Sequence, residues 1–342
     1  MLERILSKVR LNFRAGAIIV FLLIGPLGSF LYLYFVSFDA GYALYGTFGL
    51  EAGVPANFYS VASNSLWYGF LLFVPFSIRH LRMKLGKVEP TLASLSPDGE
   101  TTIRSLFSPA SSATFQLAIA AVFMTIYASS VPQLLSSGEF TTLSGSVYLL
   151  RSILRSLVFG SVLGLYCGAL WGLYRLGKRD LRLKPFKQDR YLGLREVGSL
   201  SFTFASVYFG GLGIFTIHAV LGGMTGELSI VNLLFMMSLP LLGVMLFFAP
   251  LVSTHQRMVE AKEGETATLV ELSGRILSRV PKGGEDDTVR YTELLALEAL
   301  ERKASAIPTW PFGTQMLGKL TTIMLSVTAI VIARIIQIAF GL

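Results

Sequence analysis

Seven stretches of about twenty apolar residues constrain this chain more than any other feature of its sequence. A helix needs ~20 apolar residues to cross the hydrocarbon layer of a bilayer, and each stretch has that length. Only 15% of the 342 residues are charged and the mean hydropathy is +0.62, which excludes an ordinary water-soluble protein. The sequence therefore predicts an all-α, polytopic membrane helix bundle with about seven transmembrane helices. They are expected at residues 15–36, 57–78, 113–134, 147–174, 199–221, 230–252 and 317–340.

The distribution of charge predicts the orientation of these helices. All but three of the 29 lysine and arginine residues lie in segments 1–14, 79–112, 175–198 and 253–319, which alternate with acidic or neutral loops. Those loops carry Asp39, Glu51, Glu139 and Glu227. Cytoplasmic loops are enriched in Lys and Arg, so we expect a cytoplasmic N-terminus and an external C-terminus. The net charge of +8 then indicates contact with anionic lipid headgroups and argues against nucleic acid as a partner.

The domain organisation follows from the longest segment between two spans. Residues 1–252 are expected to form transmembrane helices one to six, and residues 317–342 the seventh. Between them, apolar residues recur at helical spacing among charged ones, and the run 281–287 (Pro-Lys-Gly-Gly-Glu-Asp-Asp) predicts a turn. Residues 253–316 are therefore predicted to form a cytoplasmic helical hairpin. The apolar positions that support it are Met258, Leu269, Leu272, Ile276, Val280, Tyr291, Leu294, Leu295 and Leu300.

Several functional classes are excluded by what the sequence lacks. Cys167 is the only cysteine and there are three histidines, so neither a disulfide nor a Cys/His metal site is expected. No G-x-x-x-x-G-K-[ST], H-E-x-x-H or G-x-S-x-G motif occurs, and no acidic residue lies inside a predicted span. We therefore predict no catalytic residues, no metal, no cofactor and no enzymatic activity. Any transport would have to be passive or coupled to an ion.

A row of small residues marks the fourth predicted helix. A small residue stands at every fourth position, so the row forms a groove in which a second helix can pack closely. Gly costs ~1 kcal/mol relative to Ala in a helix, so such a row has a packing or functional reason. One interpretation is packing against another span, for example the fifth with Gly210, Gly211 and Gly213; the other is a subunit interface or a pore lining. We call these residues the small-residue row: Ser152, Ser156, Gly160, Gly164, Gly168 and Gly172.

Three arginines lie within predicted spans, all toward the external side. Arg151 and Arg155 share one face of the fourth helix because they are four residues apart, and Arg334 lies in the seventh. A charged side chain inside the bilayer is costly and needs compensation. The arginines could reach the external headgroups, pair with Glu139 or Glu227, or line a shared cavity that binds an anion or a lipid phosphate. Arg155 is the deeper arginine on the fourth helix and the strongest candidate.

His218 lies near the external end of the fifth predicted helix, on the same face as Gly211. A histidine in this position could sense pH or carry protons. It could equally be a hydrogen-bonded residue between two helices. Helix breakers accompany several spans, most clearly Pro26 with Gly25 and Gly28 in the first, and broken helices often adjoin binding sites in transporters.

Three segments of the chain share a pattern with other membrane proteins: Lys187–Leu194, Pro308–Thr314 and Phe247–Leu251, the last followed by His255, Met258 and Lys262. They resemble an uncharacterised prokaryotic family of integral membrane proteins. That family carries a His-Pro-Asp-Arg-x-Gly-Gly-Leu-like loop and a Pro-Thr-Trp-Pro-Phe-Asp-Thr-like segment. This chain departs from the pattern at Lys187-Gln188, at Tyr191-Leu192-Gly193 and at Gly313.

The resemblance implies a multi-pass protein of a prokaryotic plasma membrane but no activity. It also directs attention to Asp189 and Arg190, in the cytoplasmic loop before the fifth helix. Taken together, the residues predict a channel or transporter for a small anion, in a homo-oligomer or a membrane complex. The alternative is a structural, lipid-binding or regulatory membrane subunit that acts through its cytoplasmic hairpin.

Overall fold

In the part that it describes, the computed structural model of the chain consists of helices joined by turns and loops. It describes residues 13–37, 43, 47, 58–97, 99–128, 142–186, 188–221, 230–278 and 287–339, without the side chains of some helical residues, among them 230–236, 287–290 and Arg334. Every regular element in these ranges is a helix, which confirms the all-α class.

Among the described residues, seven helices or helix pairs are long and apolar enough to cross a membrane, as predicted. We call them spans one to seven. In chain order they lie in α2 (Phe13–Ile24) with α3 (Pro26–Ser37), α5 (Phe58–Ala93), α6 (Gly99–Ser111) with α7 (Ala113–Ala128), α9 (Thr142–Gly177), α10 (Arg195–Leu221), α11 (Ile230–Phe248) and α14 (Thr314–Ala339). The sixth candidate run extends from Met237 in α11 to Arg275.

The third span begins earlier than predicted. The sequence places it at 113–134, but the helical segment that contains the apolar window extends from Gly99 to Ile126, and residues 129–134 lie outside the described part. The Gln116 side-chain amide donates to the carbonyl of Ala110 (2.9 Å), and the backbone N–H of Phe115 donates to the hydroxyl of Ser112 (3.3 Å). These bonds bridge the break between α6 and α7, so the two helices form one span.

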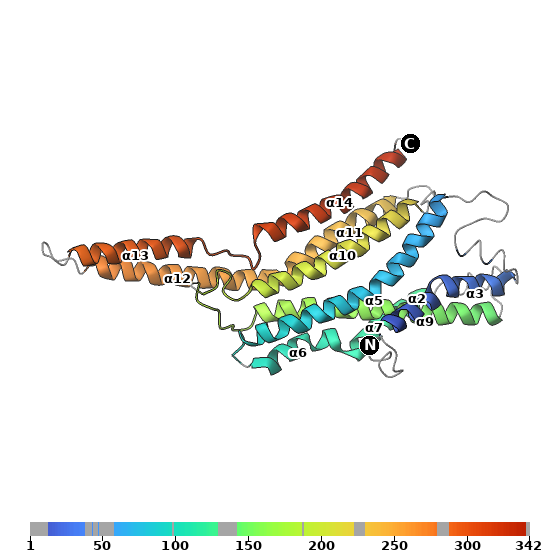
Figure 1. The fold of residues 1–342 in the computed structure, drawn as a ribbon, viewed down its shortest axis with the longest axis horizontal. Coiled ribbons are helices and arrows are strands. Elements are labelled where there is room, and N and C mark those ends of the chain that lie inside the picture. The colour runs from blue at the N-terminus through green and yellow to red at the C-terminus, as the bar shows by residue number, and fades with distance from the viewer. Residues whose placement is uncertain are drawn as a thin grey trace.

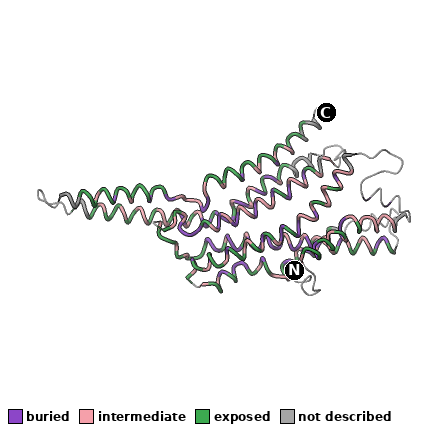
Figure 2. Tube along the Cα trace, in the orientation of Figure 1, coloured by how far each residue is buried: buried purple, intermediate pink, exposed green. Residues whose placement is uncertain are grey.

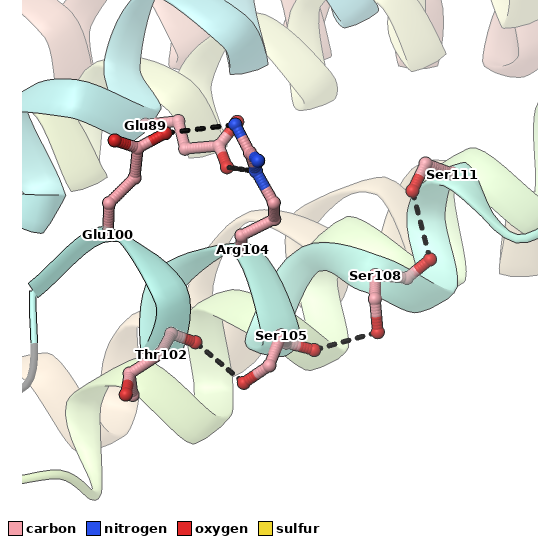
Figure 3. A network of polar contacts seen from close by, with 7 residues as sticks. All are labelled: Glu89, Glu100, Thr102, Arg104, Ser105, Ser108 and Ser111. Atoms are coloured by element: carbon pink, nitrogen blue, oxygen red, sulfur yellow. Dashed lines mark hydrogen bonds and ion pairs between the residues drawn. The ribbon is translucent and has the colours of Figure 1, made fainter.

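Because α6 carries several polar residues (Figure 3), the sequence pattern indicated a loop in this part of the chain. Arg104 forms ion pairs with Glu100 (2.9 Å) and Glu89 (3.8 Å). The hydroxyl of Ser108 donates to the carbonyl of Ser105 (2.8 Å), which Pro109 cannot bond because proline has no N–H. The hydroxyls of Ser105 and Ser111 likewise donate to carbonyls three residues back. These exposed serines are satisfied within their own helix, which an apolar environment requires.

The spans form two groups joined along one helix pair (Figure 1). In the first group, α2, α3, α6 and α7 pack around α9. In the second, α11 and α14 pack against α10. Helices α5 and α10 join the groups, and Figure 2 shows the buried residues concentrated along the central helices. The largest fully buried side chains include Leu71, Leu165, Leu173, Phe204, Phe209 and Phe247.

One end of the bundle carries most of the positive charge. Here α5 and α9 end and α10 and α14 begin (Figure 1). We call it the basic end. The basic residues near these helix termini include Lys84, Lys87, Arg175, Lys178 and Arg195.

Two further helices extend from the basic end. The 3₁₀ turn η1 (Ala249–Leu251) links α11 to α12 (Val252–Ser278), and α13 (Asp287–Ser305) lies beside α12 (Figure 1). In the N-terminal half of α12, the Lys262 ammonium donates to the carbonyl of Ser305 at the C-terminal end of α13 (2.7 Å), so the two helices are antiparallel. The predicted turn at 281–287 falls mostly outside the described residues. The α12–α13 pair projects from the bundle (Figure 1) and exposes apolar side chains, namely Val270, Leu272, Tyr291 and Leu295.

Candidate functional site

Arg151 and Arg155 face the break in the first span. They lie on one face of α9, and that face packs against α2 and α3. The Arg151 guanidinium donates to the hydroxyl of Ser29 through Nη2 (2.7 Å). Arg155 donates to the carbonyl of Ile24 through Nη2 (3.4 Å). Both arginines therefore bind the few residues at which α2 gives way to α3.

The local sequence explains why the first span breaks there. Pro26 has no N–H, so the carbonyl of Leu22 loses its usual helical donor. At the break, Gly28 comes so close to the carbonyl oxygen of Leu23 that a β-carbon on Gly28 would overlap it. The same β-carbon would lie 2.9 Å from Cδ of Arg151. A glycine is required here, because any side chain would displace the backbone or the arginine.

The two guanidinium groups are incompletely satisfied. The Nε atoms of Arg151 and Arg155 are buried and have no hydrogen-bond partner among the described residues. Their bonded partners are a hydroxyl and a carbonyl, which are neutral, and neither arginine forms an ion pair with a described carboxylate. The carboxylates considered from the sequence, Glu139 and Glu227, lie outside the described part. This pair of cations is therefore a candidate site for an anion.

Arg334 belongs to the other group of helices. It lies on α14, which packs against α10 and α11, and Figure 1 shows α14 on the side of these helices away from α9. The side chain of Arg334 is outside the described part. The described packing thus brings Arg151 and Arg155 together but gives no support to a site shared with Arg334 in one chain.

The small-residue row of α9 packs within the chain, against α6 and α7. A β-carbon on Gly160 would lie 2.6 Å from Cβ of Ala120, and one on Gly164 would lie 2.6 Å from Cγ of Gln116. A β-carbon on Gly168 would overlap the backbone of Ala110, and one on Gly172 would lie 2.6 Å from the ring of Phe107. These four glycines are buried against neighbouring helices of the same chain, an arrangement that favours packing over pore lining.

The fifth span is not the partner of this row. A β-carbon on Gly210 would lie 3.4 Å from the ring of Phe73, and one on Gly211 would lie 3.5 Å from the rings of Phe70 and Phe73, so both face α5. The nearest side chain to Gly213 is Val327 of α14. The suggestion that these glycines meet the row is wrong, because they face the second and seventh spans.

Gln116 is a buried residue that the sequence interpretation missed. It is fully buried, bridges the break between α6 and α7, and fills the space opposite Gly164. The available signal was a glutamine inside an apolar run, because polar side chains in membrane helices commonly hydrogen bond to neighbouring structure.

We expect Gln116→Leu to lower the stability by about 1–3 kcal/mol, because it leaves the buried carbonyl of Ala110 without its donor. The apparent melting temperature in detergent measures this. Thr125→Val on the same helix is the control, because the exposed Thr125 hydroxyl only bonds the carbonyl of Ala121. Equal melting temperatures for the two variants would contradict the role given to Gln116.

His218 is hydrogen bonded between α10 and α5. Its Nδ1 lies 2.9 Å from both the hydroxyl and the carbonyl oxygen of Ser63, and the hydroxyl is also 3.2 Å from the carbonyl of His218. The ring centroid of Trp67 is 5.3 Å from that of the histidine. These contacts favour the interpretation of His218 as a bonded residue between helices.

The three segments that support the family resemblance meet at the base of the α12–α13 pair. The Asp189 carboxylate accepts the N–H groups of Tyr191 (2.9 Å) and Gly193 (3.1 Å), which folds the loop around Leu192 and Gly193, both with positive φ. The ring of His255 stacks on Trp310 with centroids 4.2 Å apart. Asp189 therefore shapes the loop, and Arg190 is exposed beside it.

Backbone packing at this junction is very close. A β-carbon on Gly198 of α10 would overlap the carbonyl of Pro311, and the Tyr191 hydroxyl would lie 2.9 Å from a β-carbon on Gly313. The rings of Phe247 and Phe312 are in contact, with centroids 5.2 Å apart. The three segments thus form one packed unit.

Searches against protein-family models, curated proteins and solved structures find no match to this chain. The resemblance to a prokaryotic membrane protein family therefore stays a prediction.

Proposed function

We propose that this protein lies in a prokaryotic plasma membrane, binds a small anion beside Arg151 and Arg155, and conducts it across the bilayer passively or by ion coupling. The observation that carries this proposal is the pair of partly buried guanidinium groups with neutral bonded partners and unpartnered Nε atoms. No described carboxylate balances their charge.

The orientation is part of the same proposal. The positive-inside rule assigns the basic end, and with it the α12–α13 pair, to the cytoplasm. Arg151 and Arg155 lie in the half of α9 nearer to its other end, Thr142, and therefore in the external half of the membrane. An anion arriving from outside would meet this pair before the basic end.

The cost of placing two arginines in the bilayer is lower with an anion bound beside them than without one. One Arg at the centre of a bilayer costs from about 2.5 to more than 10 kcal/mol, and a second positive charge one helical turn away adds repulsion. A bound anion offsets both costs. Guanidinium groups suit this purpose because they remain charged and present several N–H donors in one plane.

The broken first span supplies a suitable setting. At the break, Ile24 and Ser29 bind the arginines through neutral oxygen atoms, which orient the guanidinium groups without neutralising them. The aromatic side chains of Tyr32 and Tyr148 lie near Arg151, with ring centroids 6.2 Å apart. Non-helical backbone beside polar residues within a span is the arrangement that transporters use at their binding sites.

We expect Arg155→Gln to reduce anion flux by about tenfold or more, because it removes one charge-assisted hydrogen-bond donor from the site. The measurement is flux of chloride, nitrate and phosphate into liposomes with the purified protein, with potassium and protons tested in parallel. Arg155→Lys, which keeps the charge, should retain part of the flux. The matched control is Arg104→Gln, because Arg104 is an exposed arginine on α6.

The alternative is a structural, lipid-binding or regulatory subunit. It is favoured by one observation, the exposed apolar side chains Val270, Leu272, Tyr291 and Leu295 on the projecting α12–α13 pair. Absence of flux for every ion, with a correctly folded protein, would reject the anion pathway and favour this alternative. Equal flux for wild type and Arg155→Gln would reject the role of the arginine pair.

A further inference from the structure

A groove opens at the base of the α12–α13 pair, on the basic end of the bundle. Its volume is about 450 Å³, and it lies between the loop that precedes α10 and the C-terminal end of α13. The residues that line it are Phe186, Arg190, Leu300, Lys303, Ala306 and Ile307. We call it the basal groove.

The rim of the basal groove carries two available cations. Arg190 and Lys303 are exposed, and among the described residues neither has a hydrogen-bond or ion-pair partner. The adjacent carboxylate of Asp189 is occupied by the N–H groups of Tyr191 and Gly193. Both cations are therefore free to bind an anionic group from outside the protein.

The end of α13 does not repel such a group. The C-terminal carbonyls of a helix carry a partial negative charge, which would disfavour an anion. Here the Lys262 ammonium donates to the carbonyls of Ser305 (2.7 Å) and Ile307 (3.2 Å) and offsets that charge. The electrostatic environment of the basal groove is consequently positive.

The floor of the basal groove is apolar. Ile307 is buried, and together with Leu192 and Ala304 it forms a small core against which Phe186 packs. A groove with a cationic rim and an apolar floor fits a molecule that has both an anionic head and a hydrocarbon part. Inorganic phosphate has only the first of these.

The position of the basal groove suits a membrane lipid. It lies close to the residues at which α10 and α14 begin, and therefore at the boundary of the spans. Trp310, in the segment leading into α14, is a residue type enriched at that boundary. Exposed basic residues in the segment before α10, Arg179 and Arg182 among them, attract anionic headgroups to the same surface.

We infer that the basal groove binds one anionic phospholipid of the adjacent leaflet. Arg190 and Lys303 bind its phosphate, and Phe186, Leu300 and Ile307 contact the first methylene groups of an acyl chain. This site is separate from Arg151 and Arg155, and the inference does not depend on anion conduction.

The test is native mass spectrometry of the full-length protein in detergent, titrated with phosphatidylglycerol and separately with phosphatidylcholine. We expect one retained phosphatidylglycerol, and about tenfold weaker binding in the double variant Arg190→Gln/Lys303→Gln. Arg179→Gln/Arg182→Gln removes the same charge from the same surface and should change the affinity less than about twofold.

Two further measurements distinguish lipid binding in the basal groove from general electrostatic attraction of lipids to the basic end. Ala306→Trp keeps both cations but fills the groove, so it should weaken phosphatidylglycerol binding to a similar extent. The inference is overturned if Ala306→Trp binds as wild type, or if both double variants lose equal affinity. It is also overturned if glycerol 3-phosphate, which has no acyl chain, competes at the affinity of the lipid.

Discussion

Gly168→Leu is expected to lower the apparent melting temperature by roughly 5 °C or more, with much of the protein lost to aggregation. The reason is the contact between α9 and α6. Even a β-carbon on Gly168 would overlap the backbone of Ala110 and would lie 2.7 Å from the carbonyl carbon of Pro109. Backbone atoms cannot move aside as a flexible side chain can, so the two helices have to separate.

The matched control is Gly69→Leu. Gly69 also lies in a span, but a β-carbon there would meet nothing within 4 Å, because Gly69 lines an apolar surface groove with Leu66 and Phe73. The melting temperature of the Gly69→Leu variant should stay unchanged or rise slightly, since Gly disfavours helices by ~1 kcal/mol relative to Ala. A similar fall in melting temperature in both variants would show that the small-residue row of α9 has no special packing role.

Gly28→Ala is expected to have the second largest effect, because it acts on the break and on the arginine pair together. The added methyl group would overlap the carbonyl of Leu23 and press against Cδ of Arg151 (2.9 Å). We expect a fall of roughly 5 °C in melting temperature and, in the protein that still folds, a loss of anion flux comparable to that of Arg155→Gln.

Gly213→Ala is the control for this variant. The nearest atom to a β-carbon on Gly213 is Cγ2 of Val327 at 3.8 Å, an ordinary van der Waals distance. Wild-type melting and flux in Gly28→Ala would contradict the geometry of the break. A destabilised protein with normal flux would keep the packing argument and reject the link to the arginines.

The number of spans was predictable because the length of an apolar stretch is a local property. The break in the first span was foreseeable for the same reason, since Pro26 removes a helical N–H wherever the helix packs. The helical start of the third span at Gly99 was not predictable, because Arg104 and the serines of α6 are typical of a loop. Only the hydrogen bonds within α6 show how those polar groups are satisfied.

Which helices pack together was not predictable from one sequence. The small-residue row indicates close packing along α9, but any face with small or apolar residues could have met it. The glycines of α10 were a reasonable partner by composition, and they face α5 and α14 instead. The sequence could predict that Arg151 and Arg155 lie close together, because they are one turn apart on the same helix. It could not predict whether Arg334 lies near them, because that depends on how the helices pack.

The order of helices along the chain bears on how the protein is made. The helices that surround most of α9, namely α2, α3, α5, α6 and α7, all precede it in the sequence. The C-terminal part of α9 also contacts residues that follow it in the sequence. For example, the hydroxyl of Ser253 donates to the carbonyl of Tyr174 (2.9 Å). During synthesis the N-terminal part of a chain is available for folding first. Arg151 and Arg155 can therefore reach Ser29 and Ile24 before α10 has been synthesised, and the second group then assembles on a face that α5 already presents.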